Sequence, residues 1–369
     1  MNRLLVPLLT VLSLSLSSCL PAGRGADETW VTHRRDGTLL VNGRPFFPFG
    51  FYHLAWAEDG TAQGRLDDLR EIGRGGFNVV WTEPLSGAQE FGPLLEAARR
   101  SGVYVVAHEL APAAAREVAA HPALLGFTLM DDSNRQSTPR AIRQLQREYK
   151  RLAPRKLTYI SLSVGVDRPE RAFFGVSDAV GNQSYPVGDP VDRIGVVYPA
   201  MRQTVLSAAR RGVVPIANLQ TFAWERRDLP SEAEVRNMTY QALMAGVKGV
   251  VYYAYRTEGH DIGEDPAAWR AAQVLAGEVR TLAPTLLDGK RTELLSGRGD
   301  EALAVLVERL RGPWYLFVLN NRETSREVRV RVPGVSRLTP VFGGATLEME
   351  RGVVEGTLPS LAAQVYEVR

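Results

Sequence analysis

Short apolar runs alternate with amphipathic stretches from about residue 47 to residue 288. Most of the runs are continuous rather than interrupted by polar residues, as in parallel strands that are covered on both faces. Between the runs, apolar residues recur at helical spacing, as Ile142, Leu145, Tyr149 and Leu152 do. The pattern predicts strands at 47–52, 79–82, 103–108, 124–130, 157–161, 179–183, 213–220 and 250–255.

This repeated strand and helix pattern matches one architecture in size. Eight β/α units in about 240 residues are typical of a (β/α)8 barrel. A doubly wound sheet is the main alternative, but no glycine-rich turn follows the first strand to hold a dinucleotide phosphate. We therefore predict an α/β protein with a (β/α)8 TIM barrel over residues 30–288.

The helical pattern ends near Lys290, and short strands follow. Residues 327–332 alternate between valine and charged residues, as in a half-exposed antiparallel strand. Similar signals occur at 302–310, 314–320, 346–349 and 363–368. We predict a small C-terminal antiparallel β-sandwich over residues 289–369.

The first 19 residues predict a targeting segment rather than part of the fold. Arg3 precedes the apolar run 4–16, which is too short to span a bilayer comfortably. The run leads into Leu16-Ser17-Ser18-Cys19, which resembles a bacterial lipobox, and Cys19 is the only cysteine in the chain. We predict lipidation of Cys19, a tether over 20–29 and an outward-facing, membrane-anchored protein in the cell envelope. A plain secretory signal with an incidental cysteine is the alternative.

Charge and motif content narrow the chemistry. The formal net charge of +3 is too small to indicate a nucleic-acid partner. No group of His and acids has metal-ligand spacing, and no Ser-His-Asp signature is present. We therefore expect no metal, cofactor or nucleic acid.

Two adjacent acids, Asp131 and Asp132, directly follow the predicted strand 124–130. The carboxyl ends of all strands in such a barrel share one rim, where catalytic residues lie. Aromatic rings pack on sugar faces, while amides and carboxylates bind hydroxyl groups, so the rim favours a carbohydrate groove. The predicted substrate contacts are Trp81, Glu109, Asn182, Tyr185, Gln220, Trp224 and Tyr253.

Four segments carry a family resemblance. They are LLVNGRPFFPFGFYH (39–53), LREIGRGGFNVVWTEP (69–84), HPALLGFTLMDDSN (121–134) and LPSEAEVRNMTYQALMAGVKGVVYYAY (229–255). Together with a small C-terminal β-sandwich, they resemble the clan A glycoside hydrolases over roughly residues 38–369. The resemblance implies glycoside hydrolysis on a TIM barrel.

Carried over by position, the resemblance places Asp132 where the family has its acid/base Glu, and Asp131 where it has Asn or Asp. It places Gln220 where the family has a nucleophilic Glu, and Gln cannot act as a nucleophile or base. Asp132 is the predicted general acid, and Asp131 is the neighbour that orients it and raises the upper titration of the pair.

Three chemical possibilities remain at this stage. Glu225 could reach back from its loop as the second carboxylate. Asp131 and Asp132 could instead support attack by an N-acetyl group of the substrate, with Tyr185 or Gln220 holding that group. Finally, the site could bind glycan without cleaving it, as an envelope lipoprotein on a degenerate barrel would. A hydrolase acting on another polar bond is a weaker reading.

Overall fold

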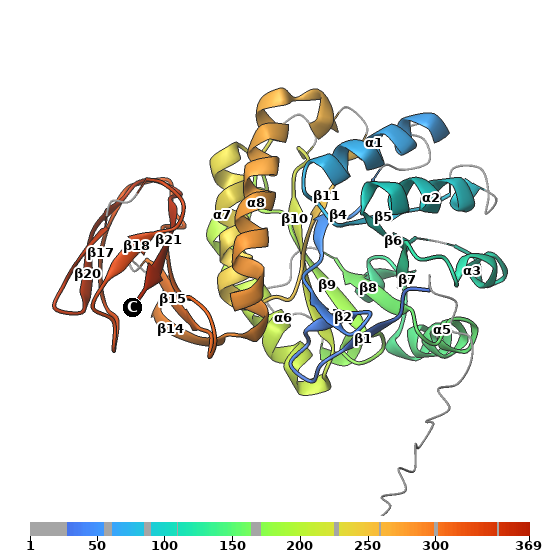
Figure 1. Cartoon of the computed structure of the whole chain (residues 1–369), viewed down its shortest axis with the longest axis horizontal. Helices are drawn as coiled ribbons and strands as arrows, with labels where there is room; N and C mark the ends of the chain where they lie inside the picture. Colours follow the sequence, from blue (N-terminus) through green and yellow to red (C-terminus); the bar gives the residue numbers. More distant parts are fainter. Residues whose placement is uncertain are drawn as a thin grey trace, which may run out of the picture.

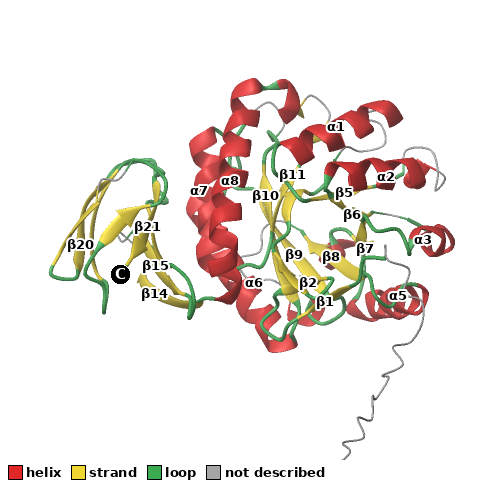
Figure 2. Ribbon diagram, viewed as in Figure 1, coloured by secondary structure: helices red, strands yellow, loops and turns green. Residues whose placement is uncertain are grey.

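The computed structural model describes residues 28–54, 61–84, 90–108, 110–163, 171–224, 229–257, 260–298, 302–344 and 347–369. Its larger part is a closed barrel of eight strands, all paired in parallel (Figures 1 and 2). In barrel order the strands are β4 (Phe49–Phe51), β5 (Val79–Thr82), β6 (Tyr104–Ala107), β7 (Leu124–Met130), β8 (Leu157–Leu162), β9 (Ala179–Ser184), β10 (Val214–Gln220) and β11 (Val250–Tyr253). The predicted TIM barrel is confirmed.

Helices surround the strands on the outside of the barrel (Figure 2). The α-helices are α1 (Ala62–Arg74), α2 (Phe91–Ser101), α3 (Pro112–Val118), α4 (Ser133–Gln136), α5 (Pro139–Leu152), α6 (Val197–Arg211), α7 (Glu232–Ala245) and α8 (Pro266–Asp288), with short 3-10 helices at Arg171–Phe173, Ile194–Val196 and Ile262–Glu264. Their starts follow local chemistry, since Thr138 caps α5 and Ser231 forms a capping box with Glu234 at α7. None of the described helices combines the length and the apolar character needed to cross a membrane.

Two apolar layers hold the barrel together. Leu69, Leu95 and Ile142 belong to the layer between strands and helices. Tyr52, Trp81 and Tyr159 belong to a second cluster that fills the barrel interior. Each strand therefore buries both faces, which explains why its sequence is a continuous apolar run.

A small antiparallel sheet covers the amino end of the barrel. It consists of β1 (Val31–His33), β2 (Leu39–Val41) and β3 (Arg44–Phe46). Val31, Leu39 and Val41 join the interior cluster. The buried Lys156 amine, at the amino end of β8, donates to the carbonyl oxygens of Thr29 and Leu124. Any opening into the interior therefore lies at the other end, where the strands point.

The chain continues from α8 into two antiparallel sheets. One has the order β14-β15-β16-β21-β18 and the other β17-β20-β19. Their strands are β14 (Lys290–Ser296), β15 (Leu303–Glu308), β16 (Trp314–Leu319), β17 (Arg326–Arg331), β18 (Leu338–Pro340), β19 (Leu347–Glu350), β20 (Val353–Leu358) and β21 (Ala363–Val368). A β-rich C-terminal part is thus confirmed, and β14, β18 and β20 add to the predicted strands. After the last barrel strand, two short antiparallel strands of two residues each form a pair, β12 (Arg256–Thr257) and β13 (His260–Asp261).

The larger C-terminal sheet packs on both of its faces. Leu306 and Val318 face the smaller sheet, within the same cluster as Val330. Val305 and Phe317 point the other way and join the apolar layer of the barrel. In Figure 1, α7 and α8 lie between these C-terminal sheets and the barrel strands.

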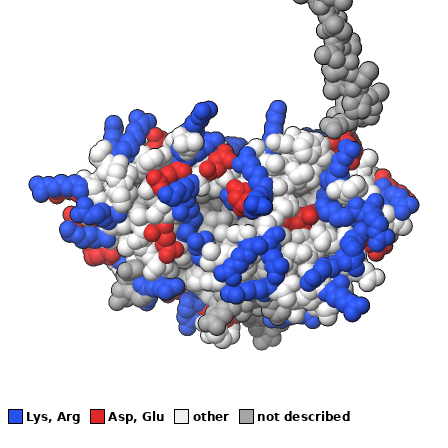
Figure 3. All heavy atoms as spheres, turned by 90° about the horizontal axis from the view of Figure 1, so that it is seen from below, with Lys and Arg blue, Asp and Glu red and all other residues white. Residues whose placement is uncertain are grey.

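Charges are mixed on the face drawn in Figure 3, where basic side chains are the more prominent and acidic ones lie among them. The predicted targeting segment, Cys19 and residues 20–27 of the predicted tether lie outside the described residues.

Candidate functional site

A cavity of about 760 Å³ lies at the carboxyl end of the barrel strands. Small-molecule sites commonly have this size. Residues from several strand ends and the loops after them line it. They are Tyr52, Asp131, Asp132, Arg135, Ser163, Gln183, Tyr185, Asp189, Pro190, Val191, Asp192, Phe222, Trp224, Tyr253 and Thr257. The cavity thus collects both acids of the predicted pair and three of the predicted substrate contacts, Tyr185, Trp224 and Tyr253.

The backbone that carries the two acids is tightly held. The pairing of β7 with β8 changes register between Thr128 and Met130. This irregularity changes the direction of the side chains at the end of β7, just before the two acids. Asp132 then has a left-handed backbone, with φ of 42°. The Asn134 side chain accepts the Ser163 backbone N–H at 2.8 Å, which ties this turn to the end of β8.

Asp131 is oriented by two hydroxyl groups. The Tyr52 hydroxyl donates to its Oδ1 at 2.6 Å, and the Ser161 hydroxyl donates to the same oxygen. Ser161 also accepts the Asp132 backbone N–H at 2.9 Å. Burial, the charge of Asp131 and the neighbouring Tyr159 raise the pKa of Tyr52 well above its usual value, so this phenol remains a donor. Asp131 is therefore a fixed hydrogen-bond acceptor.

Asp132 has a different environment. The Gln183 amide donates to its Oδ1 at 2.9 Å, and the side chain is partly exposed to the cavity. Burial and the adjacent Asp131 charge raise the pKa of Asp132, while Gln183 and Arg135 act in the opposite direction. Burial and the charge of Asp131 therefore favour the protonated form of Asp132.

Aromatic rings form a wall on another side of the cavity. The Tyr185 ring centroid lies 5.2 Å from that of Phe222 and 6.0 Å from that of Tyr253. The Trp224 ring is 4.9 Å from Phe222, and its Nε1 donates to the Tyr185 carbonyl oxygen at 3.1 Å. We call these four residues, Tyr185, Phe222, Trp224 and Tyr253, the aromatic wall.

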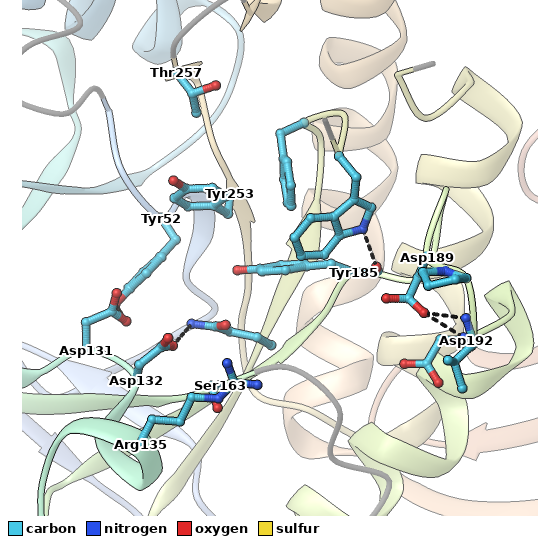
Figure 4. A pocket seen from close by; sticks show the side chains of 15 residues that line it. Tyr52, Asp131, Asp132, Arg135, Ser163, Tyr185, Asp189, Asp192, Tyr253 and Thr257 are labelled. Carbon is cyan, nitrogen blue, oxygen red and sulfur yellow. Dashed lines mark hydrogen bonds between the residues drawn. The ribbon is translucent and has the colours of Figure 1, made fainter. Parts of the chain in front are cut away.

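The Tyr185 hydroxyl lies at the inner edge of this wall. Figure 4 shows it pointing towards the side of the cavity that carries Asp131 and Asp132. Burial and the charge of Asp131 raise the pKa of Tyr185 well above its usual value. The hydroxyl is buried and has no hydrogen-bond partner among the described residues. A neutral phenol donor therefore points at the acid pair.

Three other predicted contacts that the structure describes do not line the cavity. Trp81 is fully buried inside the barrel against Tyr52 and Tyr159. The Asn182 amide points outward and donates to Thr204 of α6 at 2.9 Å. Gln220 is buried beneath the aromatic wall, where it accepts the Val187 N–H and donates to the Val187 and Phe222 carbonyl oxygens. Gln220 therefore connects the loop after β9, which contains Val187, to the loop after β10, which contains Phe222. Glu109 and Glu225 lie outside the described residues.

Several cavity residues are absent from the predicted set. Tyr52 and Gln183 stand at strand ends, and that position is the signal that could have selected them. Arg135 lies in the short helix α4, and Phe222 and Asp189 come from loops, where no periodic pattern marks the residues that face inward. Ser161, which orients Asp131 without lining the cavity, carries no signal either, because it acts through contacts across strands.

Asp131 also belongs to a group of three residues that are distant in the sequence and close in space. His53, His108 and Asp131 offer ligand atoms that all lie within 4.8 Å of one another. Imidazole and carboxylate ligands suit divalent transition metals. Sequence spacing gave no sign of this group, because each member comes from a different strand. Burial, His108 and the Arg65 guanidinium lower the pKa of His53 well below its usual value, and the same Arg65 charge disfavours a metal cation there.

Comparison with known proteins adds a fold-level result. No protein-family model and no curated protein matches the sequence. A glycoside hydrolase family 5 protein from Bacteroides vulgatus ATCC 8482 superposes with a TM-score of 0.62 at 15% identity, over 92% of this chain and 93% of that one. An Anoxybacillus alpha-amylase has a TM-score of 0.60 at 12% identity, over 91% and 99% of the two chains. A family 39 glycoside hydrolase from Bacteroides cellulosilyticus WH2 has a TM-score of 0.56 at 11% identity, over 90% and 84%. These three likenesses concern the fold alone, and they agree with the TIM barrel described above.

Proposed function

We propose that the protein is a glycoside hydrolase that cleaves a poly- or oligosaccharide by carboxylate acid/base catalysis, with Asp132 as the general acid. One observation carries the proposal. Asp132, whose pKa is raised by burial and by Asp131, borders a cavity of about 760 Å³ opposite an aromatic wall. A proton donor beside a surface suited to sugar rings is what glycosidic cleavage requires.

Asp131 has a supporting role in this proposal. Because the Tyr52 and Ser161 hydroxyls both donate to its Oδ1, Asp131 stays in one orientation and keeps its second oxygen for the substrate. Its charge also raises the pKa of Asp132. Asp131 therefore tunes the acid and positions the sugar that the acid protonates.

An ordinary glycosidase mechanism also needs a second carboxyl group. Retaining glycosidases place their two carboxyl groups about 5 Å apart and inverting ones about 6.5–9.5 Å apart. Glu225 is the candidate that sequence order provides, since it directly follows Trp224 of the aromatic wall. Replacement of Glu225 by Gln tests this candidate through the stereochemistry and rate of turnover.

A panel of polysaccharides and aryl glycosides of both anomeric configurations tests the function. We expect the purified chain to release product from at least one class, with saturable kinetics. Exposed Asp67 on α1 supplies a matched control, Asp67→Asn, which makes the same chemical change outside the cavity. Absence of turnover across the panel would remove the hydrolase proposal.

The pH dependence of kcat/KM should report Asp132. A general acid acts in its protonated form, and a raised pKa preserves that form to higher pH than an ordinary aspartate near 3.9 allows. We expect kcat/KM to fall by about tenfold per pH unit above that pKa. With substrates that have poor leaving groups, this fall in kcat/KM at high pH should appear for the wild type and for Asp67→Asn. If Asp132→Asn showed the same fall, another group would be responsible for it.

A non-catalytic glycan-binding protein is the second candidate. Gln220 favours it, because this residue ends β10 and its side chain is used to hold Val187 and Phe222. In that case the wild type and Asp132→Asn would bind oligosaccharide with equal affinity, and neither form would turn it over. Calorimetry on both forms distinguishes the candidates.

We also infer that the chain is anchored to a membrane by lipid on Cys19. The apolar run before this single cysteine supports the inference. Cys19→Ser should move the protein from the membrane to the soluble fraction when cells are fractionated, because acyl chains supply the anchoring energy. Unchanged membrane partitioning of Cys19→Ser would exclude lipidation as the anchor.

A further inference from the structure

The Tyr185 hydroxyl is the first observation that points to a particular substrate. A buried hydroxyl without a partner is unfavourable, so such a group usually meets a ligand or water. Tyr185 lines the cavity, its hydroxyl has no partner among the described residues, and it points towards Asp131 and Asp132 (Figure 4). A ligand acceptor atom between Tyr185 and the acids would satisfy it.

The end of β10 supplies the second observation. The last residue of this strand is Gln220, and both ends of its amide are bound to backbone groups of Val187 and Phe222. An amide cannot attack an anomeric carbon, and this one faces the loops rather than the cavity. Among the described residues, β10 therefore offers no nucleophile.

The third observation is that the adjacent residues Asp131 and Asp132 have different hydrogen-bond partners. Asp131 uses one oxygen for Tyr52 and Ser161, which leaves its other oxygen as an acceptor. Asp132 accepts one bond from the Gln183 amide and borders the cavity. One site thus holds a fixed acceptor, a proton donor and the Tyr185 phenol donor.

Building on the proposed hydrolase function, we propose that the substrate is a 1,2-trans glycoside of a 2-acetamido sugar, and that its own acetamido oxygen is the nucleophile. An acetamido group offers an N–H donor, a carbonyl acceptor and a methyl group. The N–H fits Asp131, the carbonyl oxygen fits the Tyr185 hydroxyl, and the methyl group fits the aromatic wall.

In the first step, the acetamido carbonyl oxygen forms a bond to the anomeric carbon. The bond from that carbon to the leaving oxygen breaks, and its electron pair stays on the leaving oxygen, which takes the proton of Asp132. Asp131 holds the acetamido N–H and balances the positive charge that develops on the bicyclic oxazolinium. Tyr185 orients the attacking oxygen by donating to its second lone pair.

In the second step, water adds to the anomeric carbon while the Asp132 carboxylate removes one of its protons. The bond from the anomeric carbon to the oxazolinium oxygen breaks, and the electron pair restores the acetamido carbonyl. The sum is one water consumed and one glycosidic bond cleaved with retained configuration. The attack comes from the face opposite the leaving group, so a 1,2-cis glycoside cannot react in this way.

Binding of a stable mimic tests the inference without turnover. Sugar-fused thiazolines, in gluco and galacto configurations, imitate the oxazoline intermediate, and calorimetry measures their affinity. We expect one of them to bind the wild type. Tyr185→Phe should weaken that binding by about threefold, because the ring sulfur that stands for the attacking oxygen is a weak acceptor. Tyr104→Phe is the matched control, since Tyr104 packs edge-to-face against Phe46 at the amino end of the barrel. Absence of binding by both thiazolines would overturn the inference.

Kinetics provide the second test. We expect aryl 2-acetamido glycosides of 1,2-trans configuration to be cleaved, and their 2-hydroxy counterparts and 1,2-cis anomers to be resistant. Replacing N-acetyl by N-trifluoroacetyl weakens the nucleophile and should lower kcat/KM by about tenfold or more. A rate that is insensitive to fluorination contradicts the acetamido nucleophile.

The two proposals fail in different ways. Hydrolysis of 2-hydroxy glycosides without thiazoline binding would overturn the acetamido inference and leave the hydrolase proposal standing. Thiazoline binding without hydrolysis of any glycoside would remove the hydrolase proposal and retain an acetamido-sugar binding site.

Discussion

Replacement of Asp132 by Asn is expected to lower kcat/KM for cleavage of an unactivated oligosaccharide by about 10²- to 10⁴-fold, the usual contribution of general acid catalysis. The leaving sugar oxygen is a poor leaving group unless it is protonated as the bond breaks. Asn has the shape of Asp but carries no transferable proton. The loss should therefore appear in the chemical step.

This variant should keep the fold. Asp132 has φ of 42°, a left-handed conformation that Asn tolerates better than most residues. The Asn side-chain oxygen can still accept the Gln183 amide, and the backbone bond to Ser161 does not depend on the side chain. Circular dichroism and the unfolding midpoint should match those of the wild type.

Leaving-group dependence makes the prediction specific. A nitrophenolate needs little protonation, so Asp132→Asn should lose much less activity on nitrophenyl glycosides than on oligosaccharides. Asp67→Asn should retain wild-type kinetics on both substrates. Equal losses on both classes of substrate would contradict a proton-donor role for Asp132.

The second large effect concerns stability. Gly50→Ala should lower the free energy of unfolding by about 3 kcal/mol, at the upper end of the usual range for overpacking. A Cβ at Gly50 would lie 1.7 Å from the carbonyl oxygen of Val79 on the neighbouring strand β5. Because that atom belongs to the backbone, β4 and β5 would have to move apart, and Tyr52 would move with β4.

Gly277→Ala provides the control for this change. Gly277 lies within α8, and a Cβ there would meet no atom within 4 Å. The same substitution should stabilise the protein by about 0.5–1 kcal/mol, because glycine weakens a helix interior. Chemical denaturation followed by circular dichroism measures both. An unchanged midpoint for Gly50→Ala would contradict the close approach of β4 and β5.

The barrel could be predicted because its strands are buried on both faces. The runs at 79–82 and 124–130 coincide with β5 and β7, and the position of Asp131 and Asp132 at the cavity follows from the end of β7. Strand β18 carries only one partly buried residue, Leu338, and so gives no comparable signal. Strand β20 is interrupted by Gly356 and a polar stretch.

The site was less predictable. A position at a strand end places a residue near the rim of the barrel, but it does not determine the direction in which the side chain points. Trp81 turns into the barrel, where Tyr52 covers it, and Asn182 turns outward to Thr204. The change of register before Met130 re-aims the residues after β7, and alternation along the strand does not reveal it. Contacts such as Ser161 with Asp131 join distant parts of the chain, so only three-dimensional structure brings them together.

Helix α7 shows how the parts of the molecule depend on one another. Residues 237–245 of this helix are all buried, and the Asn237 amide donates to the carbonyl oxygens of Asn320 and Leu361 in the C-terminal part. The helix leads into β11, which ends at Tyr253 of the aromatic wall. The C-terminal sheets therefore support α7 from its outer side. Without them, the barrel would expose an apolar face of α7 to water, and α7 is the helix that precedes the strand carrying Tyr253.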